Sequence, residues 1–409
     1  MAGTNLSADE VQRAVISAYE DSEDTLTNTD LYRQVQAKLD LTDMQMSECA
    51  PVGKSGRTHN LAHRRLRWCQ QNARRMGLLE RVEGKRGVWR LKKRQQDDPK
   101  QAPAGMALVA FSTKLGVAIF ARCESVFPHL HDGVAVAITS PPYAVAKGRA
   151  YGKVGEREYV DFICSSLEPI VKALLPGGSV ALNISNDVFE RGSAARSLYK
   201  YRLVLALHHR LGLQLCDEVI WAKGSPVPGV PMQWCAKSRQ QLNAAYEPIL
   251  VFTNSPKDWF ASVDRVLQPV SERHARLIAR GGEQRTASYS DGAHTLKPGS
   301  FGRPVEGTIM RNVINLGHFD KESVALNRYA EANGLQAHGA PMPYRLAEIL
   351  VRWLSRPGDL VVDPFGGRLT TAAAAERTGR NWLACDSQWD YLAQAVTRFP
   401  GARLNQNAA

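Results

Sequence analysis

The chain has 409 residues, 44% of them hydrophobic, which is enough for one large folded core and one smaller domain. Its 52 Lys and Arg residues outnumber its 40 Asp and Glu residues, and the formal net charge of +12 favours a polyanionic partner. The seven cysteines form no C-x-x-C pair and no apolar run approaches a membrane span, so we expect a cytoplasmic protein with no metal site, disulfide framework or membrane partner.

Residues 1–95 predict a small α+β domain made of two helices, a basic helix and a hairpin. Apolar residues recur at helical spacing after Ser7, and again from Leu31 behind a Thr or Asp cap. Two short strands joined at Gly84–Gly87 predict a wing at the end of the domain. Between them, the third helix has one apolar stripe, and its opposite face collects Arg64, Arg65, Arg67, Gln71, Arg74 and Arg75.

This order of elements resembles a winged helix-turn-helix. Between Arg57 and Arg94 the sequence has thirteen Lys or Arg residues and two Glu residues. A basic helix of this kind can contact phosphates, and its Arg and Gln side chains can reach base edges. The resemblance implies a DNA-binding domain, and the alternative is a basic helix that docks on a protein.

Residues 96–105 are polar and contain two prolines, so they predict a linker ahead of a second domain at 106–409. In that domain the apolar run 134–139 predicts a buried strand, which ends in a tight turn of Ser140, Pro141, Pro142 and Tyr143. A helix, a Pro-Gly-Gly turn and another strand follow, and this strand ends near Asn183, Asn186 and Asp187. These three side chains either line a site or cap the next helix, and we favour capping.

Residues 360–386 predict a strand, a glycine turn, a helix and a second strand. The first strand ends in Asp363, Gly366 and Gly367 form the turn, and the second strand ends in Asp386, 23 residues after Asp363. This is half of a doubly wound nucleotide-binding fold, in which the second acid accepts hydrogen bonds from ribose hydroxyls. A βαβ unit that binds no nucleotide is the alternative.

These segments resemble the S-adenosylmethionine-dependent DNA methyltransferases that modify exocyclic amines. D-P-F-G-G-R-L-T-T at 363–371 is similar to their cofactor motif, and T-S-P-P-Y at 139–143 is similar to their catalytic motif. The resemblance implies an α/β fold with a doubly wound, mostly parallel sheet of the Rossmann-like methyltransferase type, and S-adenosylmethionine as cofactor. It assigns catalysis to Ser140, Pro141, Pro142 and Tyr143, and cofactor binding to Asp363, Pro364, Phe365, Gly366, Gly367, Thr370 and Asp386.

The order of the two motifs resembles the β-type permutation of this family. Ser140 precedes Asp363 by 223 residues, so catalysis comes first and cofactor binding last. The family inserts target recognition between them, and we expect it at about 256–311, a stretch without a clean period that could instead be a surface loop. Because only 23 residues follow Asp386, a further strand of the sheet must come from elsewhere, and 116–127 is the candidate.

Three residues depart from the family pattern. Arg368 and Leu369 stand where the family has Ser and Gly, so we expect the methionine end of the cofactor pocket to be shaped differently. Arg122 stands where the family often has an acid, which puts that acid's contact to the adenine amino group in question.

The chemistry that the resemblance implies is methyl transfer to an exocyclic amine of a base flipped out of double-stranded DNA. The Ser140 hydroxyl and the Pro141 carbonyl can accept hydrogen bonds from that amine, and Tyr143 offers a face for stacking. A serine before Pro-Pro-Tyr resembles the N4-cytosine enzymes, and N6-adenine is the runner-up. The other classes are a non-catalytic DNA-binding regulator and an RNA or protein methyltransferase, and a cognate restriction endonuclease and a homodimer are partners left open.

Overall fold

A computed structural model describes the protein at residues 8–22, 25–52, 57–75, 79–82, 84–91, 100–131, 133–143, 156–190, 192–224, 233–317, 320–339 and 341–405. The chain divides into two compact units, Met1–Asp98 and Pro99–Ala409. Among the helices of the described residues, none combines the length and apolarity needed to cross a bilayer.

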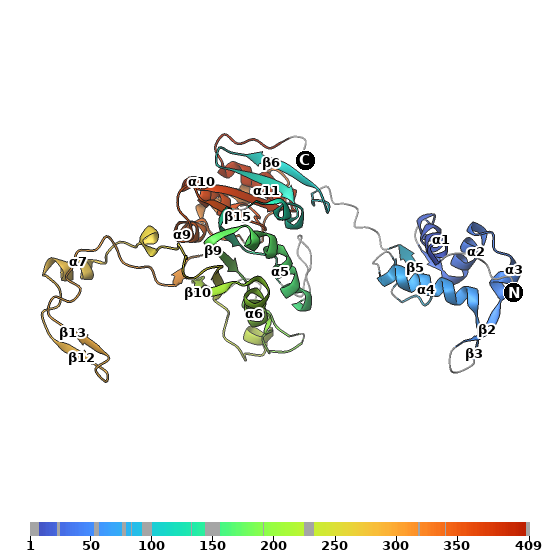
Figure 1. The fold of residues 1–409 in the computed structure, drawn as a ribbon, viewed down its shortest axis with the longest axis horizontal. Helices are drawn as coiled ribbons and strands as arrows, with labels where there is room; N and C mark the ends of the chain where they lie inside the picture. Colours follow the sequence, from blue (N-terminus) through green and yellow to red (C-terminus); the bar gives the residue numbers. More distant parts are fainter. Residues whose placement is uncertain are drawn as a thin grey trace. The chain divides into compact units, whose positions relative to one another are not determined.

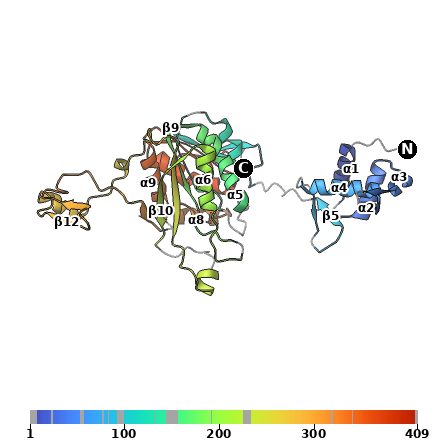
Figure 2. The same ribbon diagram turned by 60° about the horizontal axis from the view of Figure 1, so that its bottom comes forward.

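The first unit has the winged-helix order that the sequence predicts, with helices packed over a three-stranded sheet of order β1-β5-β4 (Figure 2). Thr27 begins the second helix as its N-cap and accepts a hydrogen bond from the backbone N–H of Asp30. The wing is an antiparallel pair of β4 and β5. The elements are α1 (Ala8–Glu20), β1 (Leu26–Thr27), α2 (Asn28–Lys38), α3 (Asp43–Ser47), β2 (Cys49–Val52), β3 (Arg57–Asn60), α4 (Leu61–Arg75), β4 (Leu79–Arg81) and β5 (Val88–Leu91).

The basic helix α4 begins at Leu61, one residue before the first residue of its predicted apolar stripe, Ala62. The Asn60 side chain accepts a hydrogen bond of 2.8 Å from the backbone N–H of His63, and this side-chain cap marks the start of the helix. The residues before it, Arg57–Asn60, pair with Cys49–Val52 as an antiparallel hairpin that the sequence did not predict. On the inner side of α4, Leu66, Cys69 and Ala73 are buried, as the stripe predicts.

The second unit is built on a nine-stranded, mostly parallel sheet of order β14-β10-β11-β9-β8-β15-β16-β7-β6 (Figure 1). Its strands are β6 (Ala107–Ser112), β7 (Gly116–Ala121), β8 (Val134–Thr139), β9 (Leu174–Asn183), β10 (Gln214–Ala222), β11 (Tyr246–Thr253), β14 (Val313–Asn315), β15 (Leu360–Asp363) and β16 (Asn381–Asp386). The strand expected from 116–127 is β7, which runs parallel to β16 and pairs on its other side with β6, the antiparallel edge strand.

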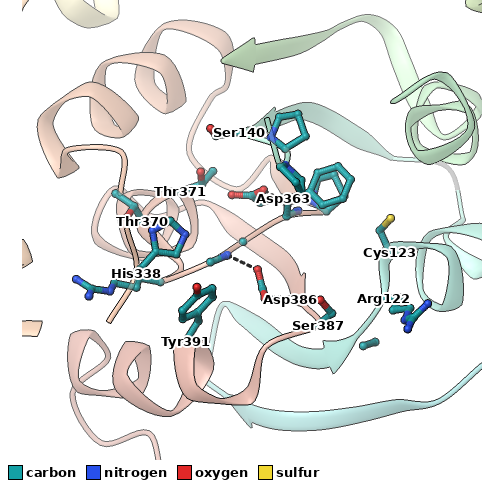
Figure 3. Close-up of a pocket in the computed structure, with 18 of the residues that line it drawn as sticks. Arg122, Cys123, Ser140, His338, Asp363, Thr370, Thr371, Asp386, Ser387 and Tyr391 are labelled. Carbon is teal, nitrogen blue, oxygen red and sulfur yellow. Dashed lines mark hydrogen bonds between the residues drawn. The ribbon is translucent and has the colours of Figure 1, made fainter. Parts of the chain in front are cut away.

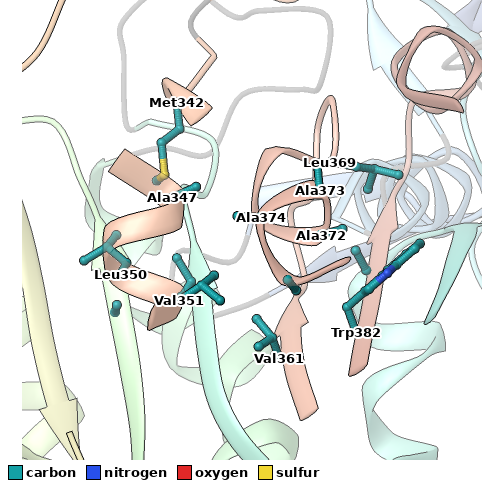
Figure 4. Close-up of a cluster of buried hydrophobic side chains, with 14 of the residues drawn as sticks. Met342, Ala347, Leu350, Val351, Val361, Leu369, Ala372, Ala373, Ala374 and Trp382 are labelled. Carbon is teal, nitrogen blue, oxygen red and sulfur yellow. The ribbon is translucent and has the colours of Figure 1, made fainter. Parts of the chain in front are cut away.

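Helices cover both faces of this sheet, and each side has its own apolar cluster. One cluster joins α5 (Glu156–Lys172) and α6 (Tyr199–Leu211) to the sheet. The other joins α9 (Tyr344–Leu354), α10 (Thr370–Arg377) and α11 (Trp389–Ala395) to the opposite face (Figure 4). The unit also contains α8 (Lys321–Ala332). This arrangement is the doubly wound architecture that the sequence predicts.

The expected recognition insert leaves the sheet after β11 and returns to it at β14. It contains a short helix, α7 (Glu272–Ala279), and a small hairpin of β12 (Ala287–Tyr289) and β13 (His294–Leu296). β14 pairs with β10 in parallel, so both ends of the insert are fixed in the sheet.

The second half of the expected linker differs from its prediction. Ala102 is only 1% exposed, and its backbone N–H donates to the carbonyl of Ser387 at 2.8 Å. Polar composition suggested a free segment, but backbone pairing and the small side chain of Ala102 let residues 100–103 pack on the sheet domain. We call residues 100–103 the strap.

Candidate cofactor and catalytic site

A pocket opens at the carboxyl ends of β8, β15 and β16, where a doubly wound sheet usually binds its ligand. The cofactor motif and the catalytic motif, more than 200 residues apart in sequence, meet here because β8 and β15 are neighbours in the sheet. Figure 3 shows Ser140, Asp363 and Asp386 around the same space. All of the predicted catalytic and cofactor residues line it: Ser140, Pro141, Pro142, Tyr143, Asp363, Pro364, Phe365, Gly366, Gly367, Thr370 and Asp386.

Two carboxylates stand at the ends of adjacent parallel strands in this pocket. Burial raises the pKa of Asp363 to about 7, although the Thr139 hydroxyl donates to its Oδ1 at 2.7 Å and opposes the shift. Burial also raises the pKa of Asp386 to about 6. A site that buries two acids in this way favours a ligand that carries positive charge and hydroxyl donors. S-adenosylmethionine has both, in its sulfonium and its ribose, so the residues present fit this cofactor.

The glycine turn is held against the second carboxylate. The backbone N–H of Gly367 donates to Asp386 Oδ2 at 2.7 Å, and the N–H of Gln388 donates to Oδ1 at 2.8 Å. A Cβ atom at Gly366 would stand 2.8 Å from the side chain of Leu369, and Gly367 has a φ of +50°. The turn therefore leaves little room for a side chain at Gly366 and favours glycine at Gly367.

The two departures in the cofactor motif have different consequences. Leu369, which stands where the family has glycine, has a left-handed backbone with a φ of +54° and buries its side chain completely. Arg368 is 2% exposed and donates to Asn327 Oδ1 on α8 at 2.6 Å. The loop thus has a positive φ at Leu369, and the side chains of Leu369 and Arg368 add contacts to the core and to α8.

The catalytic turn is fixed by a neighbouring strand. Asn183, at the end of β9, donates through Nδ2 to the Ser140 hydroxyl and to the Tyr143 hydroxyl, each at 3.4 Å. The expectation that Asn183, Asn186 and Asp187 cap the next helix is wrong. The N-cap of α6 is Leu198, and Arg196 binds the carbonyl of Asn186 and the carboxylate of Asp187.

A buried ion pair behind this turn was missed from the sequence. Glu247 Oε1 accepts from Lys223 Nζ at 2.5 Å, with the two side chains 9% and 3% exposed. The other oxygen of Glu247 accepts from the Tyr143 hydroxyl at 2.9 Å and from Asn183 at 3.3 Å. Burial and the nearby Glu247 charge raise the pKa of Tyr143, so its hydroxyl stays protonated and remains a donor. Lys223 and Glu247 both lie in or next to predicted strands, and their spacing in the sequence does not indicate that they form a pair.

Other pocket residues were also absent from the predicted set. The ring of His338 meets that of Tyr391 edge-on with centroids 4.7 Å apart, and lies under Gly367 (Figure 3). His338 begins the segment 338–359, which resembles the family's helix that leads into the cofactor motif, and this resemblance was the available signal. Arg122 and Arg368, which the sequence singled out as departures near the cofactor, also line the pocket. The lining residues that were missed are Gln101, Ala102, Ala121, Cys123, Glu124, Phe162, His338, Pro341, Met342, Thr371, Ser387 and Tyr391.

In the first unit, the predicted DNA-binding residues follow the outer side of α4. Arg64, Arg67 and Arg74 are exposed, and Arg65 and Gln71 are half-buried. The Arg75 side chain lies outside the described residues. The outer side of the helix is therefore basic along its length, as its sequence predicts.

Comparisons with known proteins agree with this fold. Residues 134–397 match the sequence model of the DNA methylase family that covers N6 and N4 enzymes, and residues 9–97 match the Mrr N-terminal domain. The chain is 29% identical over 269 residues to the type II methyltransferase M.PvuII of Proteus hauseri, covering 66% of this chain and 78% of the relative. It is 23% identical over 266 residues to M.ScaI of Streptomyces caespitosus, covering 64% and 74%. The solved structure titled PvuII DNA methyltransferase (cytosine-N4-specific) matches with a TM-score of 0.55 at 24% identity, covering 73% of this chain and 90% of that one.

Proposed function

Because the chain belongs to the N6/N4 DNA methylase family, and so is an S-adenosylmethionine-dependent DNA methyltransferase, we propose that its target is the exocyclic N4 of cytosine in duplex DNA. The observation that carries the proposed transfer to an exocyclic amine is the junction of the two motifs, and the choice of cytosine rests on Ser140. Thr139, the residue before Ser140, donates to Asp363 of the cofactor motif at 2.7 Å. The proposed amine-binding turn and the proposed cofactor site therefore share one hydrogen-bonded wall.

The pocket residues suit activation of an amine. The lone pair of an exocyclic amine is delocalised into the ring, so the amine is a poor nucleophile until its N–H groups are held out of the ring plane. The Ser140 hydroxyl and the Pro141 carbonyl are the proposed acceptors of those N–H groups, and the two prolines restrict the backbone that presents them. Asn183 holds the hydroxyl from behind. The bound cofactor supplies an electrophilic methyl group, with its ribose proposed at Asp386.

Tyr143 is proposed to stack on the target base after it has been flipped out of the duplex. Its hydroxyl is anchored to Glu247, which fixes the plane of the ring without using the ring face. Tyr143→Phe keeps the face and removes the anchor, whereas Tyr143→Ala removes both. We expect the Ala variant to require more DNA for half-maximal rate than the Phe variant.

Cytosine is favoured over adenine by the residue at 140. A neutral serine hydroxyl stands where adenine enzymes more often have an aspartate, and the relative from Proteus hauseri has a solved structure titled cytosine-N4-specific. Mass spectrometry of digested product DNA tests this assignment. N4-methylcytosine is the expected product. N6-methyladenine would refute the base assignment and keep the amine chemistry, and 5-methylcytosine would refute the mechanism.

The role of Ser140 has its own test. Ser140→Ala removes one acceptor and leaves the turn intact, so turnover should fall about 10²-fold or more. Calorimetry should give an unchanged affinity for S-adenosylmethionine, because Ser140 is assigned to the base and not to the cofactor. Unchanged turnover in a folded variant would remove Ser140 from catalysis.

We infer that two further parts of the chain serve the DNA. The basic side of α4 is proposed to bind phosphates, and the insert between β11 and β14 is proposed to recognise the target sequence. A non-catalytic regulator would bind DNA through the same surfaces, and methyl transfer to DNA distinguishes the two. Duplex DNA and RNA in competition test the remaining substrate class.

Two partners complete the proposal. A cognate restriction endonuclease is inferred from relatives named as type II methyltransferases. A homodimer is inferred from α6, which exposes Tyr201 and Leu205 together with its N-cap Leu198. Sedimentation of the purified chain gives the oligomeric state. A monomer at all concentrations would refute the dimer.

A further inference from the structure

The strap, residues 100–103, is joined to the end of β16 by backbone hydrogen bonds. Ala102 donates to the carbonyl of Ser387 at 2.8 Å, and Trp389 donates to the carbonyl of Lys100 at 2.8 Å. Gln101 and Gln388 form an antiparallel bridge between them. The strap therefore pairs with the residues that immediately follow Asp386, the acid proposed to bind the ribose.

Two side chains hold the strap in addition to this pairing. Lys100 Nζ contacts Asp390 Oδ2 at 2.9 Å, and the carboxylate of Asp390 is 2% exposed, so the pair is partly shielded from solvent. Arg122 donates through Nε to the carbonyl of Ala102 at 3.2 Å. Arg122 is the residue that stands where the family often has an acid. In this chain its side chain hydrogen-bonds to the strap.

Gln101 and Ala102 line the same pocket as Asp386, together with Arg122 and Glu124. This part of the lining comes from three separate stretches of chain, which the strap bonds connect. A cofactor whose ribose binds Asp386 would carry its base toward either the strap or the catalytic turn. The catalytic turn is assigned to the target base, which leaves the strap side for the nucleoside base of the cofactor.

We propose that the strap forms the wall of the nucleoside half of the cofactor site, and that Arg122 is a positioning residue that holds it there. This inference rests on the proposed assignment of Asp386 to the ribose. An acid at 122 would contact the adenine directly, whereas Arg122 supports a neutral wall made by Gln101 and Ala102. The segment that enters the second unit is therefore part of its cofactor site.

Full-length variants test the wall. Ala102→Glu places a charge in a buried position and should displace the strap, and Ala104→Glu, an identical change at an exposed position two residues later, is the matched control. Calorimetry with S-adenosylmethionine and with 5′-methylthioadenosine, which lacks the amino-acid end, reports the nucleoside half. We expect Ala102→Glu to weaken both ligands by about tenfold, which corresponds to ~1.4 kcal/mol, with Ala104→Glu unchanged.

Lys100→Ala provides a milder variant in case Ala102→Glu does not fold. It removes the contact to Asp390 and should weaken both ligands by the same factor as each other. Unchanged affinity for both ligands in folded strap variants would overturn the inference. If Asp386→Ala weakens binding in the same assay while the strap variants do not, the strap is refuted and the proposed cofactor site stands. If Asp386→Ala also has no effect, the proposed site itself fails, and the strap inference fails with it.

Hydrogen exchange gives a readout that does not depend on a substitution. The amides of Ala102 and Trp389 are the two donors that join the strap to the end of β16. Saturating S-adenosylmethionine should slow exchange at both amides in the unmodified protein, because the cofactor would bind only the docked strap. Exchange at these two amides that does not respond to the cofactor would overturn the inference.

Discussion

Leu369 is a non-glycine residue with a positive φ, a backbone conformation that favours glycine, and substituting it separates two opposing effects. Its φ of +54° costs a residue with a Cβ atom about 1–2 kcal/mol relative to glycine. Its side chain is fully buried next to α10, in the apolar cluster that also contains Val361 and Trp382 (Figure 4). Removing a buried leucine to alanine costs about 2–5 kcal/mol, so burial outweighs the backbone strain.

Leu369→Ala and Leu369→Gly should therefore both destabilise the protein, but in an unusual order. Both changes lose the buried leucine atoms, and only glycine also relieves the positive φ. Glycine elsewhere is less stable than alanine by roughly 0.5–1 kcal/mol, whereas here we expect it to be more stable by about 1 kcal/mol. The free energy of unfolding from urea titrations followed by circular dichroism measures the difference.

The matched control is Ala374, in the interior of the same helix, α10. Ala374→Gly should show the ordinary loss, because Ala374 is buried within regular helix. If Leu369→Gly is less stable than Leu369→Ala by as much as that ordinary loss, the positive φ is not a feature of the folded loop and the reasoning is wrong.

The further predictions concern cofactor binding, the pH dependence of stability and the salt dependence of DNA binding. Asp386→Ala should weaken S-adenosylmethionine at least about tenfold, since each lost charge-assisted bond to the ribose is worth roughly 1.5–3 kcal/mol; unchanged calorimetric affinity in a folded variant would remove Asp386 from the site. Burial raises the pKa of Asp363 to about 7 and of Asp386 to about 6, so both carboxyls stay protonated where the unfolded chain has lost the protons, and stability should fall as pH rises from about 4 to 7. A cationic cofactor favours the ionised forms, so its affinity should rise across pH 5.5–7.5 with proton release, seen as a buffer-dependent binding enthalpy; no proton release would contradict the pairing. Replacing Arg64, Arg67 and Arg74 by Ala should make the salt dependence of DNA binding shallower by about 0.9 per lost phosphate contact, and an identical slope would assign the basic helix to another partner.

Local sequence patterns were sufficient for the sheet and for the pocket motifs. Apolar runs predict the strands that end at Thr139 and Asp363, and parallel strands of one sheet have their carboxyl ends at the same edge. Ser140 and Asp363 could therefore be placed close together from the sequence. Glu247 and Lys223 could not be paired, because their contact depends on the antiparallel register of β10 and β11. Polar composition predicted a linker at residues 96–105, but the strap within it is held by backbone bonds to Ser387 and Trp389, which composition does not encode.

Docking of the strap also reduces the number of residues that can act as a tether between the two units. Four residues held against the end of β16 are not available as free chain, and released they would add at most roughly 14 Å of reach. A longer tether lowers the effective concentration of one unit near the other. A shorter tether restricts the pairs of sites that both units can occupy at once. A protein whose tether shortens when its methyl donor is bound would search DNA over a wider radius without the donor. Once the donor is bound, the surfaces proposed to contact DNA in the two units would be restricted to a narrower range of separations.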